Sequence, residues 1–368
     1  MNDFDLMKKE ICLIWFAILF FSVLNAQETK SFTAQLKEAN ILIYQNPEKA
    51  IAISQDVYDK ASDLETRITA LAILVNGYGA KGEMGKALEL ASEGVNLTAD
   101  TNNTELKVST LGSLGEQYQL IHLNKVARKY LDEAAALLEK ASFPEEIRAN
   151  IKGNLFAVKG NTYKDDIDCE YAIENYDLAI QSYMNFPDNP SVRKNLTLVY
   201  LEKGDCLMEL SETEEAKKFY QQALELAKEN KLQEYRIKGE LGIAKIQAKE
   251  GEVYLSNQTA LRLVKEVDTL LFLDIKNELF SLLADNFLEL KNIGQYEHFH
   301  QLKNQVAEEI EKRENSAFEH ALYFFNQKDK QEKESFFSSN FYLILIVIFF
   351  LLIFFIEIKF FKRPKNLS

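Results

Sequence analysis

Proline and glycine are scarce in this sequence, with 5 and 14 residues among 368. Both weaken helix interiors, so their scarcity favours helices joined by short turns. No stretch sustains the alternation of apolar and polar residues that marks a half-buried strand. These absences argue against a sheet-rich fold and predict an all-α protein.

Basic residues are outnumbered: 43 Lys and Arg stand against 56 Asp and Glu, which gives a net charge of −13. An acidic surface repels the phosphate backbone of DNA and RNA. We therefore expect no nucleic-acid partner.

Catalytic and metal-binding signatures are also missing. There is no G-x-S-x-G, no kinase signature and no Cys–His pairing that suggests a nucleophile. His298 and His300 are two residues apart, which on a helix places them on different faces. Gly77, Gly79 and Gly82 spell G-x-G-x-x-G, but a helical pattern precedes them where a dinucleotide fold needs a strand. The sequence predicts no enzyme activity, no cofactor and no metal site.

Two long apolar runs lie near the ends of the chain. Lys8 and Lys9 precede an apolar run over 11–24, the layout of a signal peptide (1–26) cleaved after Ala26, with an uncleaved anchor as the alternative. Residues 341–358 have nearly the length of a transmembrane helix. Four basic residues follow this run, and positive charge stays cytoplasmic. We expect a single-pass inner-membrane protein, with its main domain in the periplasm and a short cytoplasmic tail over 359–368.

The region between the apolar runs is repetitive. Five alanines each open a similar phrase, at separations of 37, 40, 45 and 44 residues: Ala50, Ala87, Ala127, Ala172 and Ala216. Tyrosines stand nine residues before the second, third and fourth of them, at Tyr78, Tyr118 and Tyr163. In the last three repeats a glycine lies twelve residues before the alanine, at Gly115, Gly160 and Gly204. It therefore precedes by three residues the position that the tyrosine occupies in the third and fourth repeats. Small residues allow two helices to approach, and the aromatic fills the space between them.

This pattern resembles the tetratricopeptide repeat (TPR), with its L-G-x2-Y and A-x3-F segments on two antiparallel helices. The resemblance implies a right-handed superhelical solenoid over 27–300, with five clear repeats and two degenerate ones. The period exceeds the usual 34, which implies extended helices or loops. A stripe that includes Leu302, Val306 and Ile310 predicts a charged helix within 301–340. That helix would cap the array or, alternatively, pair with a second copy, so a homodimer stays open.

In TPR proteins the concave face usually binds the partner. The positions that the resemblance assigns to this groove include Asn76, Glu116, Gln119, Asn161, Lys164 and Asp205. The asparagines would bond a peptide backbone and the acids would favour a basic ligand; the alternative is that all six are simply solvated. In the same register Cys169 and Cys206 lie at neighbouring helix ends, which makes a disulfide a hypothesis beside two separate buried thiols.

The order of these parts resembles the periplasmic sensory half of membrane-bound regulators of Bacteroidetes, without their output domain. A tail of about a dozen residues is too short to fold as a kinase or DNA-binding domain. The sequence therefore predicts a membrane-anchored periplasmic module that binds a protein or peptide. The alternative is the input subunit of a signal-transduction or transcription-regulating system, either truncated or paired with a separate output protein.

Overall fold

The computed structural model describes residues 31–43, 45–267 and 273–323, and all the regular structure in these ranges is helical. In these ranges no helix combines the length and hydrophobicity needed to cross a bilayer. The predicted signal peptide (1–26), transmembrane run (341–358) and tail (359–368) lie outside the described residues.

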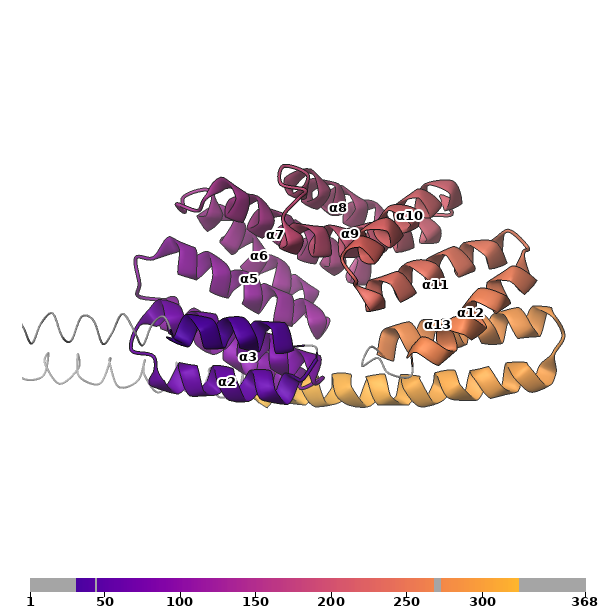
Figure 1. The fold of residues 1–368 in the computed structure, drawn as a ribbon, viewed down its shortest axis with the longest axis horizontal. Coiled ribbons are helices and arrows are strands. Elements are labelled where there is room, and N and C mark those ends of the chain that lie inside the picture. Colours follow the sequence, from indigo (N-terminus) through magenta and orange to yellow (C-terminus); the bar gives the residue numbers. More distant parts are fainter. Residues whose placement is uncertain (1–30, 44, 268–272, 324–368) are drawn as a thin grey trace, which may run out of the picture. The chain divides into compact units, whose positions relative to one another are not determined.

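The helices follow one another as antiparallel pairs (Figure 1). The first helices of the pairs are residues 31–42, α3 (Leu64–Ala80), α5 (Thr104–Leu120), α7 (Glu145–Asp166), α9 (Pro190–Glu209), α11 (Gln233–Lys249) and α13 (Leu273–Glu289). The second helices are α2 (Pro47–Lys60), α4 (Met84–Thr98), α6 (Asn124–Leu138), α8 (Cys169–Tyr183), α10 (Thr213–Glu229), α12 (Val253–Val267) and residues 293–323. The described residues contain seven such pairs. The division into five clear repeats and two degenerate ones stays a prediction.

First helices of neighbouring pairs contact one another along the array, as α3 contacts α5 and α9 contacts α11. Between the second helices α2 to α12 no such contacts occur within the described residues. A stack whose first helices lie closer together than its second helices must curve toward the first helices. The first helices therefore form the inner wall of the array and the second helices its outer face.

Small residues let the helices of a pair approach. The five repeat alanines have no exposed surface: Ala50, Ala87, Ala127, Ala172 and Ala216. Gly204 of α9 lies against the ring of Tyr220 in α10, where a Cβ atom would come within 2.8 Å of that ring. Gly115 packs in the same way on Leu131. Tyr118, placed as a core aromatic, is 2% exposed, whereas Tyr78 and Tyr163 are only half-buried.

The long repeat period has a local cause in the middle of the array. Helix α7 has 22 residues and α9 has 20, whereas the second helices that follow them have 15 and 17. The additional turns extend the inner wall, and this is where most of the polar network described below lies.

The helix that begins at residue 293 packs on both ends of the array as far as residue 317. Leu302 and Val306 cover the apolar cluster of α11 to α13. Further along, the carboxylate of Glu314 lies 3.6 Å from Nε2 of His122 in the α5–α6 turn. The guanidinium of Arg313 lies against Gly82 in the α3–α4 turn. The described residues 318–323 belong to a second unit and are helical.

Cys169 is the first residue of α8, and Cys206 is near the end of α9. Their Cα atoms are 5.1 Å apart and their side chains are joined as a disulfide. This separation lies within the usual range for such a bond. The link ties the second helix of one pair to the first helix of the next.

Candidate functional site

The six residues assigned to a groove all lie on first helices. Asn76 is in α3, Glu116 and Gln119 are in α5, Asn161 and Lys164 are in α7, and Asp205 is in α9. Asn76 and Glu116 are exposed, Gln119 is buried, and the other three are half-buried. The structure brings Lys164 and Asp205 together, 3.6 Å apart, whereas no direct contact joins Asn76 to the others among the described residues.

A four-residue charge cluster spans three first helices of the inner wall: Lys164 of α7, Glu202 and Asp205 of α9, and Lys238 of α11. Nζ of Lys164 lies 2.8 Å from the Glu202 carboxylate, and Nζ of Lys238 lies 2.5 Å from it. Lys238 is also 3.2 Å from Asp205. The four side chains are 14 to 25% exposed, so each depends on its partners for charge compensation.

Protonation in this cluster follows from the close opposite charges. Burial alone would raise the pKa of Glu202, but the ammonium groups of Lys164 and Lys238 lower it to about 2. The pKa of Asp205 is lowered for the same reason, with burial again opposing the two lysines. Burial would lower the pKa of Lys238, yet the carboxylates of Glu202 and Asp205 raise it well above its usual value. At neutral pH all four groups are charged and their charges cancel.

Asparagines extend the polar wall along α7 and α9. Oδ1 of Asn154 accepts hydrogen bonds from the Tyr183 hydroxyl at 2.6 Å and from Nδ2 of Asn195 at 2.7 Å. Oδ1 of Asn161 accepts a hydrogen bond from the Tyr176 hydroxyl at 2.8 Å. Both asparagines therefore use their oxygen internally. Their amide N–H groups have no partner among the described residues, so α7, a first helix of the array, keeps two amide donors.

The tyrosines that bind these polar groups lie on second helices, which form the outer face of the array. Tyr176 and Tyr183 lie in α8 and are fully buried, and Tyr220 of α10 is buried in the same way. The hydroxyl of Tyr220 donates to Oδ1 of Asp205 at 2.7 Å. Burial raises the pKa of each of these three hydroxyls, so they stay protonated as donors. Aromatic residues of the repeat core thus fix the orientation of the inner-wall polar groups.

Glu116 stands apart from the charge cluster. Its side chain is accessible to solvent. Desolvation by the surrounding protein raises the pKa of its carboxyl, although the charge of Lys194 lowers it. Gln119, one turn further, donates through Nε2 to Asp165 at 3.0 Å. Gln119 is therefore committed to an internal bond, and Glu116 is the more accessible of the two predicted α5 positions.

Sequence reasoning missed Asn150, whose Oδ1 accepts a hydrogen bond from Nδ2 of Asn195 at 3.2 Å. It also missed Asn154, Asn195, Glu202 and Lys238. Helical spacing could have found three of them: Asn154 precedes Asn161 by seven residues, Asn150 precedes Asn154 by four, and Glu202 precedes Asp205 by three. Asn195 and Lys238 could be identified only from the way in which neighbouring first helices align, which the sequence does not give. In the residues that the structure describes, no group of three His, Cys, Asp or Glu side chains could hold a metal ion.

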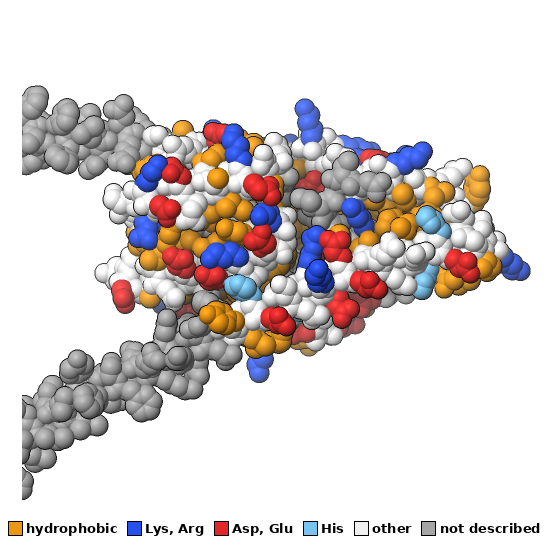
Figure 2. Space-filling model, turned by 90° about the horizontal axis from the view of Figure 1, so that it is seen from below, with side chains coloured by type: hydrophobic (Ala, Val, Ile, Leu, Met, Phe, Trp, Pro, Cys, Tyr) orange, Lys and Arg blue, Asp and Glu red, His pale blue; other side chains and the backbone are white. Residues whose placement is uncertain are grey.

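Charges on another face of the molecule are mixed. Figure 2 shows Lys and Arg side chains interspersed with Asp and Glu, with apolar side chains between them. Exposed ion pairs also occur, as between Lys49 and Glu38, 2.8 Å apart. Ion pairs of this kind contribute little to stability, so the partly buried cluster has more weight than these exposed pairs.

Comparisons with known proteins define the fold more than the function. The family model described as "Uncharacterized protein conserved in bacteria (DUF2225)" matches residues 138–276. This match covers the disulfide and the inner-wall cluster but less than half of the chain. No curated protein matches the sequence.

Several solved structures share the architecture at low sequence identity. NprR in complex with its cognate peptide NprX is 15% identical, with 88% of this chain and 95% of that chain covered and a TM-score of 0.52. The apo form of the quorum sensor NprR from B. thuringiensis is 14% identical, with 82% and 95% covered and a TM-score of 0.50. A signal transduction ATPase (STAND) with a tetratricopeptide repeat sensor from Pyrococcus horikoshii is 12% identical, with 85% and 50% covered and a TM-score of 0.52. The described part of the chain therefore has a TPR-like fold.

Proposed function

We propose that this protein is a membrane-anchored periplasmic interaction module that binds an extended peptide, or a peptide segment of a protein, on its inner wall. The observation that carries the proposal is the pair of amide donors on α7. The oxygens of Asn154 and Asn161 are held by buried tyrosine hydroxyls. Their N–H groups can therefore donate hydrogen bonds to carbonyl oxygens, which an extended peptide presents at regular spacing.

Charge complementarity adds to this arrangement. The cluster of Lys164, Glu202, Asp205 and Lys238 is internally balanced. Glu116, which lies outside it, is an acidic group whose pKa is raised by burial and whose nearby positive charge is Lys194. A ligand with a basic residue near Glu116 would bind best. In support, NprR, whose fold is similar, binds a cognate peptide.

Substitution of Asn154 and Asn161 by Asp tests the proposal. N154D/N161D keeps the oxygen that accepts each tyrosine bond and replaces only the outward amide donor. Peptides of twelve residues would be selected from a displayed library against the full-length chain. Their affinity should fall at least about tenfold in the variant, since each lost hydrogen bond costs about 1 kcal/mol and each new carboxylate repels carbonyl oxygens.

N96D/N102D, at two exposed positions, is the matched control for the added charge. It should bind the selected peptides as the unaltered chain does. Equal affinity in N154D/N161D, with unchanged melting temperature, would remove the inner wall as the binding surface.

The membrane and periplasmic parts of the proposal rest on the two apolar runs and the basic residues after position 358. The disulfide supports them, because such bonds persist in oxidising compartments. Alkaline phosphatase fused after residue 317 should be active, since that enzyme matures only outside the cytoplasm. A fusion after Ser368 should be inactive, and the reverse pattern would refute the orientation.

A second function is favoured by what two neighbours are called: one is a quorum sensor and another contains a tetratricopeptide repeat sensor. In this alternative the chain is the input subunit of a signalling system whose output protein is separate. Crosslinking in intact cells would decide between an interaction module and an input subunit. A crosslinked partner with a kinase or DNA-binding domain, captured only when peptide is present, would support the input subunit.

A further inference from the structure

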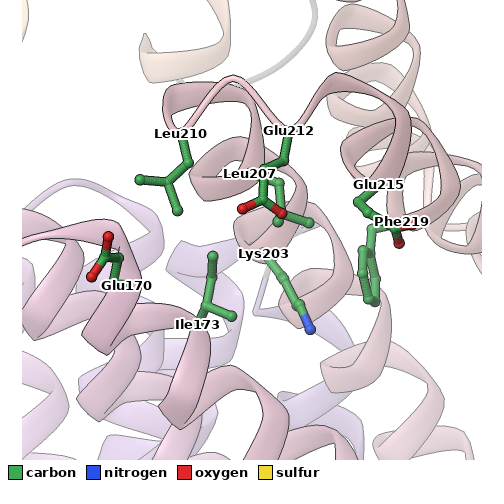
Figure 3. A pocket seen from close by; sticks show the side chains of 8 residues that line it. All are labelled: Glu170, Ile173, Lys203, Leu207, Leu210, Glu212, Glu215 and Phe219. Atoms are coloured by element: carbon green, nitrogen blue, oxygen red, sulfur yellow. The ribbon is translucent and has the colours of Figure 1, made fainter.

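A cavity lies between α8, α9 and α10, away from the polar groups of the inner wall. It has a volume of about 570 Å³, within the ~300–1,000 Å³ typical of ligand pockets. Its lining comes from α8, from the end of α9, and from the α9–α10 turn and start of α10 (Figure 3). None of its eight lining residues belongs to the polar wall described above.

Half of the residues that line this outer pocket are apolar: Ile173, Leu207, Leu210 and Phe219. Lys203 also lines it, but its charge is already compensated. Its Nζ lies 2.5 Å from Asp177 and 4.4 Å from the centre of the Phe219 ring, and its side chain is only 11% exposed. Lys203 is therefore part of the wall, and it is not available to attract an anion.

The rim of the outer pocket is acidic. Glu170, Glu212 and Glu215 are exposed and surround the opening from three sides, as Figure 3 shows. Glu215 is 2.5 Å from Lys218, whereas Glu170 and Glu212 form no ion pair with another described residue. Apolar side chains beside uncompensated carboxylates suit a ligand side chain with a hydrocarbon stem and a positive head.

The disulfide holds the two walls in place. Glu170 directly follows Cys169, and Leu207 directly follows Cys206, so the bond between the cysteines joins one wall of the pocket to the other. A pocket fixed before binding loses less conformational freedom when a ligand enters.

We propose that the outer pocket is a docking site for a basic segment of a partner protein, in which an Arg or Lys stands next to an apolar residue. The stem of the basic residue lies on Ile173 and Leu207, and its charged head lies between Glu170 and Glu212. The apolar neighbour contacts the half-exposed side of Leu210. This site is independent of the inner wall, so one module can hold a peptide and a partner at the same time.

Labelled short peptides test the outer pocket directly on the full-length chain. Acetyl-Arg-Leu-Arg-amide should bind, acetyl-Gln-Leu-Gln-amide should bind at least about fourfold more weakly, and salt should weaken the first peptide more than the second. The variant E170Q/E212Q should lose about four- to twentyfold in affinity for the arginine peptide, at about two- to fivefold for each exposed carboxylate. Glu170 and Glu212 are exposed, as are Glu133 and Glu289 of the control variant described next, so these substitutions should not affect folding.

The matched control is E133Q/E289Q, which removes the same charge from α6 and α13. It should bind the arginine peptide as the unaltered chain does. An equal loss in this control would show attraction by net charge alone and would overturn the proposal. So would equal binding of the two peptides. A loss of affinity for the arginine peptide in N154D/N161D would show that the peptide binds on the inner wall, and it would also overturn the proposal.

Discussion

Replacing Lys238 by methionine should destabilise the middle of the array. The substitution removes two contacts of the ammonium group, to Glu202 at 2.5 Å and to Asp205 at 3.2 Å. Two charges about 3 Å apart attract by roughly 5 kcal/mol at an effective dielectric constant of 20. Part of this attraction is offset by the desolvation of Lys238, which the variant no longer requires. Lys164 still compensates one of the two carboxylates.

The net loss should be about 2–3 kcal/mol in the free energy of unfolding. This is somewhat less than the roughly 3–5 kcal/mol that follows when a fully buried ion pair loses one partner. The cluster is 14 to 16% exposed at Lys238, Glu202 and Asp205, which justifies the smaller figure. Urea unfolding followed by circular dichroism measures it, and hydrogen exchange of α9 and α11 shows where the stability is lost.

The control for this prediction is the exposed pair of Lys49 and Glu38, whose nitrogen and oxygen are 2.8 Å apart with both side chains more than half exposed. K49M should cost at most about 0.5 kcal/mol. K238M/E202Q should recover part of the loss, because it leaves no uncompensated carboxylate. If K238M costs no more than K49M, the cluster is not a stabilising element.

Three other predictions concern the same region of the array. The pKa of Glu202 is lowered from 4.5 to about 2 in the folded chain. Its contribution to stability is therefore complete above about pH 5 and is lost as the pH falls toward 2. The difference in melting temperature between the unaltered chain and E202Q should shrink over that range. G204A should cost about 1–3 kcal/mol because its Cβ would lie 2.8 Å from a tyrosine ring, whereas G79A, with no atom within 4 Å, should be neutral or slightly stabilising; urea midpoints decide. C169A/C206A should lose about 3–4 kcal/mol, the loop-entropy value for a separation of 37 residues, and a reductant should lower the urea midpoint of the unaltered chain but not that of the variant.

The helical repeat fold was predictable because its determinants are local in sequence. An alanine and an aromatic at a constant offset indicate a helix pair wherever they occur, and repetition of the offset indicates stacking. The two weakest units could be assigned as well, because Gly242 and Phe287 keep their positions in α11 and α13. The placement of the six predicted groove residues on first helices followed from the same register, and their role as a groove stays a prediction.

The pairing between inner-wall groups could not be predicted in this way. Lys238 and Glu202 are 36 residues apart, and their contact depends on how far α11 is displaced along α9. Helix length sets that displacement, and α7 and α9 are longer than the TPR pattern implies. The outer pocket likewise depends on the separation of α8 and α10, which no spacing within one helix reveals.

The buried tyrosines link the stacking of the repeats to the chemistry of the inner wall. The ring of Tyr220 lies between Gly204 and Gly242, on neighbouring first helices, while its hydroxyl donates to Asp205. A substitution that removes such a ring changes the spacing of the first helices as well as one hydrogen bond. Y220F removes only the hydrogen bond. A defect in peptide binding that appears in Y220F without loss of stability therefore reports on the inner wall itself, whereas a defect in Y220A does not separate the two roles.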